Sequence, residues 1–98
     1  MITFTQYLLP NGEKRPVSIV RPEEIEALAE KVRSIGARFE IECLRTGDVS
    51  LECVLRGDET QILSSAMCSN GPGIGFVVDI LVREAYDSAI ERRMLEAE

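Results

Sequence analysis

Residues 38–55, RFEIECLRTGDVSLECVL, give the clearest indication of the fold. On both sides of the central RTG segment, apolar residues occupy alternate positions, which is the pattern of two half-buried strands joined by a hairpin turn. A three-residue loop that closes with its glycine in the left-handed conformation pairs Leu44 with Asp48. In this register the alternating apolar residues share one face of a sheet, and Glu40 lies directly opposite Glu52 on the other face.

The rest of the chain contains further strand and helix signals. Stretches rich in β-branched and aromatic residues predict strands, and apolar residues at helical spacing predict helices. Turn signals separate them: PNGE at residues 10–13, RGDE at 56–59 and the glycine-rich loop from residue 69. The expected elements are strands at residues 2–9, 17–19, 37–44, 49–55 and 60–68, and helices at residues 22–35 and 74–95.

This order, ββαβββα, indicates an α+β fold. We expect a two-layer sandwich in which an antiparallel sheet carries both helices on one face. A chain of 98 residues forms one domain, and its apolar fraction of 45% is ordinary for a globular protein. There is neither a long apolar run nor an N-terminal signal pattern, so we expect no membrane association. Three cysteines in such a chain favour reduced thiols and a cytoplasmic location.

The net charge of −6 limits the choice of partners. Proteins that bind nucleic acids neutralise phosphates with clustered lysine and arginine, but this chain has only Lys14 and Lys31, and its arginines are scattered. Direct binding of nucleic acid is therefore not expected. An acidic field favours association with a basic protein surface instead. The alternative is that the charge only keeps a small protein soluble.

Catalytic signals are weak. The chain has no histidine, which removes catalysis by histidine-dependent triads and metal binding by histidine. Cys68 is the best candidate nucleophile, but no base is evident beside it. We therefore expect no catalytic residues, no cofactor and no enzyme activity. The alternative is a nucleotide- or anion-binding enzyme or regulator that uses the loop Gly71 to Gly75, although this loop lacks the spacing of known phosphate-binding motifs.

Glu40, Glu42 and Glu52 form the most unusual local feature. In the derived register all three carboxylates lie on the outer face of the sheet, and like charges opposite one another destabilise strand pairing. Three interpretations follow: a solvated face paired with nearby arginines, a docking patch for a basic partner, or a site for a divalent cation. Extended strands lack the loop geometry that calcium sites use, so we expect no metal. We take these glutamates as the partner-binding residues.

The second predicted helix carries two apolar stripes. One has the normal spacing of a core face. The other consists of Tyr86, Ile90 and Met94, spaced four residues apart and turned away from the first. Because a contiguous exposed apolar patch usually marks a binding surface, we expect these residues to form the interface of a homodimer.

Two segments carry a resemblance to known proteins. Residues 4–12, FTQYLLPNG, followed by RPVSI at 15–19, resemble the opening of small uncharacterised acidic proteins of bacteriophages and prophages. The later SNGP at 69–72 is similar to a segment of the same proteins. This resemblance covers about a fifth of the chain and that loop, and it includes no active-site motif. It implies a protein of the bacterial host cytoplasm that binds and inhibits a host protein, including one with a role in defence.

Overall fold

The computed structural model describes residues 1–8, 12–55 and 58–96. The element order confirms the ββαβββα prediction and the α+β class. Residues 9–11, which include the end of the first predicted strand and the start of the predicted turn at 10–13, lie outside the described residues. So do residues 56–57 of the predicted turn at 56–59. The elements are β1 (Ile2–Leu8), β2 (Glu13–Ile19), α1 (Glu23–Arg33), β3 (Ala37–Cys43), β4 (Asp48–Leu55), β5 (Asp58–Ser69) and α2 (Ile74–Glu91).

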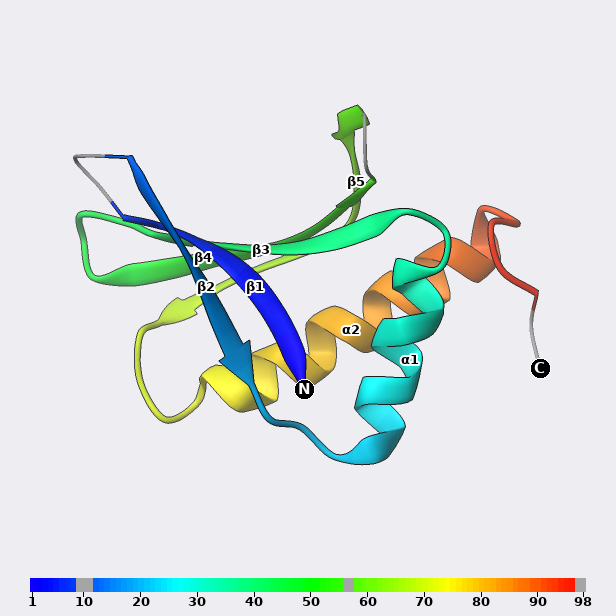
Figure 1. The fold of residues 1–98 in the computed structure, drawn as a ribbon, viewed down its shortest axis with the longest axis horizontal. Coiled ribbons are helices and arrows are strands. Elements are labelled where there is room, and N and C mark those ends of the chain that lie inside the picture. The colour runs from blue at the N-terminus through cyan, green and yellow to red at the C-terminus, as the bar shows by residue number, and fades with distance from the viewer. Residues whose placement is uncertain (9–11, 56–57, 97–98) are drawn as a thin grey trace.

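The strands form one sheet in the order β2-β1-β3-β4-β5. Figure 1 shows both helices on the same side of this sheet, as the sequence predicts. One pairing differs from the prediction, because β1 and β3 are parallel and the sheet is therefore mixed. Consecutive strands joined by hairpins are antiparallel, whereas β3 reaches β1 only after the crossover through α1, and such a connection permits parallel neighbours.

The core lies between the helices and the inner face of the sheet. Phe4 and Phe39 meet there, with their ring centroids 5.8 Å apart. Each helix contributes one buried stripe to this core. The stripes are Ile25, Ala29 and Val32 of α1, and Val78, Leu81, Val82, Ala85 and Ala89 of α2. The largest fully buried side chains of this core are Ile2, Phe4, Ile25, Val32, Val49, Leu51, Cys53, Val78, Leu81 and Val82.

The register derived for the central hairpin is confirmed. Glu40 pairs with Glu52 and Phe39 pairs with Cys53. The Leu44 amide donates a hydrogen bond of 2.8 Å to the Asp48 carbonyl, which closes the predicted three-residue loop. Gly47 has a φ of 92°, in the left-handed region that a side chain would disfavour.

The helix boundaries differ slightly from those expected. Pro22 is the residue before the first helical one, and its carbonyl accepts the amides of Ile25 and Glu26. The predicted second helix extends to Leu95, but α2 ends at Glu91 because Arg93 adopts a φ of 60°. The Met94 amide then bonds back to the Ala89 carbonyl, which turns the chain out of the helical path.

Candidate functional site: the open face of the sheet

The face of the sheet that points away from the helices has no secondary structure over it among the described residues, as Figure 1 shows. We call this surface the open face. Its members follow from the strand pairings, since directly opposite partners point to the same side. The open face includes Thr3, Thr5, Lys14, Pro16, Ser18, Arg38, Glu40, Glu42, Ser50, Glu52, Val54, Ile62, Ser65 and Met67.

Glu40 lies near the centre of the open face. Its strand neighbours are Thr5 on β1 and Glu52 on β4. The Arg38 guanidinium forms an ion pair with Glu40, with 2.8 Å between Nε and Oε1. Glu42 is exposed, and its partner on β4 is Ser50. The structure therefore brings the three predicted glutamates onto one surface, with Arg38 beside one of them.

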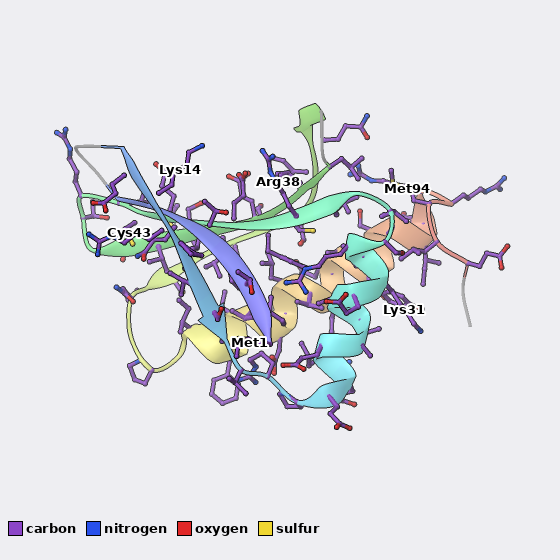
Figure 2. The ribbon with its side chains drawn as sticks, viewed as in Figure 1. Met1, Lys14, Lys31, Arg38, Cys43 and Met94 are labelled. Atoms are coloured by element: carbon purple, nitrogen blue, oxygen red, sulfur yellow. The ribbon has the colours of Figure 1, made fainter. Side chains whose placement is uncertain are left out.

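Two cations accompany these glutamates. Figure 2 shows Lys14 and Arg38 on the same side of the sheet, away from the helices. Hydroxyl groups fill much of the remaining surface, and Thr3 and Ser18 lie within hydrogen-bond distance of each other across β1 and β2. The open face is thus a polar sheet surface with a central group of carboxylates. Ionised carboxylates accept strong charge-assisted hydrogen bonds from arginine and lysine, so this surface is suited to a basic partner.

The structure gives little support to a metal site or to a nucleophilic cysteine. Among residues 1–8, 12–55 and 58–96, no group of three cysteine or acidic side chains is placed to hold a metal ion. Cys43, Cys53 and Cys68 are free thiols. Burial raises the pKa of Cys53 to about 12. Burial, together with the nearby Asp48 charge, also raises the pKa of Cys68, which leaves this candidate nucleophile in its unreactive thiol form.

The glycine-rich loop before α2 has a packing role. The Ile74 amide donates to the Gly71 carbonyl, and the Phe76 amide donates to the Gly73 carbonyl, so these groups are already occupied. A Cβ atom at Gly75 would lie 2.7 Å from Nη1 of Arg21. A glycine here lets the Arg21 side chain lie against α2. The geometry adds nothing to the anion-binding interpretation of this loop.

Arg21 itself was not singled out by the sequence. Its Nε and Nη2 atoms donate to the two carboxylate oxygens of Asp79 at 2.5 and 2.6 Å, and this contact raises the pKa of Arg21. The two residues are 58 positions apart, so no local pattern could have paired them. This two-point ion pair fixes the entry to α1 against the first turns of α2.

The predicted self-association residues are partly covered. Tyr86, Ile90 and Met94 are all half-buried. Tyr86 packs against α1, with the Lys31 ammonium 5.7 Å from its ring centroid. Met94 follows the end of α2, so the three residues do not form one continuous helical ridge.

The sequence did not indicate the exposure of several large apolar side chains, among them two on α2 and one on β5. Phe76 and Ile80 on α2 are 74% and 52% exposed, and Met67 on β5 is 63% exposed. The helical pair could have been found from its four-residue spacing on the side of α2 opposite the core stripe. The exposure of Met67 could not have been found, because the register of β5 depends on a bulge that the sequence does not reveal.

Comparisons with protein-family models, with curated proteins and with solved structures give no match. Neither helix of the described chain has the length and apolarity needed to span a membrane. The resemblance of residues 4–19 to phage proteins therefore stays a prediction.

Proposed function

We propose that this protein is a small non-catalytic binding module that docks on a basic surface of another protein through its open face. The observation that carries this proposal is the placement of Glu40 directly opposite Glu52, with Glu42 on the same surface. Paired like charges cost stability in a sheet, and their presence on an uncovered face is accounted for if a cationic partner binds there.

The position of these carboxylates supports the proposal. They lie on β3 and β4, interior strands of the sheet whose other face is buried in the core, so their backbone positions are fixed before binding. A preorganised surface loses less conformational entropy when it binds. The net charge of −6 would add long-range attraction toward a basic partner.

The biological setting forms part of the same proposal. The resemblance of residues 4–19 to phage proteins favours the cytoplasm of a bacterial host as the location. It also favours inhibition of a host protein, with defence machinery as one class of target. An inhibitor of this kind needs only a complementary surface, and it needs no catalytic residues.

Capture of partners from bacterial host lysate tests the proposal. Immobilised protein should retain a partner at low salt and release it as salt rises, because surface charge interactions are screened beyond about 8 Å at physiological ionic strength. The variant with Glu40, Glu42 and Glu52 all changed to Lys should lose this partner. A matched control changes three exposed glutamates of the helical layer, Glu23, Glu84 and Glu91, to Lys.

The control variant has the same net charge as the test variant, so the comparison separates a local patch from overall acidity. Loss of the partner with the test variant alone supports docking through the open face. Equal loss with both variants would mean that only the total charge matters. Full retention by a folded test variant, checked by circular dichroism, contradicts the proposal.

A further inference from the structure

β5 is the edge strand of the sheet and pairs only with β4 among the described strands. It is the longest strand, at 12 residues. Residues 60–69, TQILSSAMCS, contain no charge and no proline. An edge strand presents unpaired backbone N–H and C=O groups, and long uncharged edges readily pair with another strand. The carbonyl of Ile62 already accepts a hydrogen bond from Arg92, so the available part of the edge follows Ile62.

We propose that this protein forms a homodimer in which the β5 strands of two copies pair antiparallel about a two-fold axis at Met67. The two sheets then join into one continuous sheet. This pairing places the Met67 side chains of both copies opposite each other on the open face. It accounts for a methionine that is 63% exposed in the single chain. On the inner face, Cys68 of each copy lies opposite the other copy's Ala66, and both are partly buried small residues.

The position of α2 favours an axis at Met67 over one nearer the middle of β5. The Ser64 hydroxyl donates to the Leu81 carbonyl at 2.8 Å, which fixes the level of α2 along the strand. From Ser64 to Met67 the strand advances about 10 Å. From Leu81 back to Ile74 the helix also covers about 10 Å. An axis at Met67 therefore lies level with the start of α2, and the two α2 helices extend away from it in opposite directions without overlap.

The charge distribution also permits a second copy as the occupant. A chain with a net charge of −6 repels itself, but the paired segment is uncharged. The nearest carboxylate of the glutamate group is Glu52 on β4. In the dimer the two Glu52 strands are separated by three strand spacings, about 14 Å. This distance exceeds the screening length at physiological ionic strength, so the repulsion is weak.

Sedimentation equilibrium of the full chain tests this dimer. The wild type should have twice the chain mass of 10.9 kDa at micromolar concentrations. Met67→Lys should raise the dimer dissociation constant about 100-fold or more, because it places two like charges face to face at the axis. Since Met67 is exposed, the variant should keep its fold. Ile80→Lys introduces the same charge at another exposed apolar residue, about 9 Å further along α2 than Ile74, and should leave the dimer unchanged.

The remaining outcomes overturn the proposal. A wild type that is monomeric up to hundreds of micromolar excludes the dimer. A dimer that survives Met67→Lys lies at another surface. Dissociation by Ile90→Glu but not by Met67→Lys would return the interface to the ridge of Tyr86, Ile90 and Met94.

A cross-linking experiment checks the register independently. Directly opposite residues of antiparallel strands have Cα atoms about 4.5–5.5 Å apart, which lies within the range that a disulfide spans. Met67→Cys in a Cys68→Ser background should therefore give a covalent dimer when its thiols are oxidised with diamide. The control Ser18→Cys, exposed on the opposite edge, should remain a single chain. Equal cross-linking of both variants would show random collision and contradict the register.

Discussion

The two edges of the sheet differ in both packing and charge. β2 is mostly exposed and has Glu13, Lys14, Arg15 and Pro16 in its first half. β5 packs against α2 and is free of charge from residue 60 to residue 69. Charged residues and proline are the devices by which proteins keep an edge strand from pairing with other chains. One edge of the sheet is therefore protected against association, whereas the other is left able to pair.

The two edge strands also differ in how deeply their inward-facing side chains are buried against the helices. Leu63 of β5 is buried, whereas Val17, the corresponding inward-facing residue of β2, is half-buried. α2 covers β5 directly, and the Ser64 hydroxyl bonds to the backbone of this helix. β5 is therefore a structural strand of the core as well as an edge. Substitutions within it must be chosen on its exposed side if they are to report on association alone.

The largest expected effect separates the two edges by their contribution to stability. Leu63→Ala should lower the free energy of unfolding by about 2–5 kcal/mol, because it leaves a cavity under α2. Val17→Ala should cost less than about 1 kcal/mol, since its surroundings are already partly open to water. Urea denaturation followed by circular dichroism measures both. A cost for Val17→Ala equal to that for Leu63→Ala would show that β2 is as tightly packed as β5.

The sequence predicted those parts of the fold that depend on local pattern. Alternation of apolar residues and the glycine of the RTG loop were enough to place Glu40 opposite Glu52, as the structure confirms. The parallel pairing of β1 with β3 was missed because it joins strands separated by a whole helix. The end of α2 was also missed, since a left-handed arginine at position 93 has no clear sequence signal.

The candidate site was predictable to a similar extent. The three glutamates could be placed on one face from the register alone, and the ion pair of Arg38 with Glu40 agrees with the expected offset of charge. The exposure of Met67 could not be derived, because a bulge near Val54 shifts the β4–β5 register. The coverage of Tyr86 by Lys31 depends on how α1 packs against α2, which no local pattern specifies.

A smaller effect on the free energy of unfolding is expected at high pH, and it involves Cys53 of β4. Cys53, opposite Ser64 of β5, has a pKa of about 12 in the folded chain because it is buried, against an ordinary value of 9.0. The folded state thus holds this proton over a range in which the unfolded state loses it. Stability from this group is complete below pH 9 and is lost as pH rises from about 9 to about 12.

At pH 10.5 this linkage should lower the free energy of unfolding by about 2 kcal/mol relative to pH 8. Comparison of urea denaturation at the two pH values, for the wild type and for Cys53→Ala, isolates the effect. The variant is less stable throughout, but it should lose about 2 kcal/mol less over this interval. Parallel losses in both proteins would mean that Cys53 does not titrate in this range and that its surroundings are more open than the structure indicates.

The smallest expected change in stability gives the most direct test of the two edges. Changing Lys14, Arg15 and Pro16 together to Thr should alter the free energy of unfolding by no more than about 0.5 kcal/mol, because these side chains are exposed. The same variant removes the features that keep β2 from pairing. If β5 already joins two copies, a second open edge allows dimers to add to one another, and light scattering should detect species larger than a dimer.

A control variant with Arg45→Thr and Arg83→Thr loses the same number of positive charges away from the edges and should keep the size of the wild type. If the β2 variant also keeps that size, the charges and proline of this edge are not what prevents its pairing. If the wild type is a monomer and the β2 variant forms only dimers, β2 pairs while β5 stays closed, and the assignment of the two edges must be exchanged. Growth beyond the dimer in the β2 variant alone requires both edges to be open, which is the outcome that the contrast between β2 and β5 predicts.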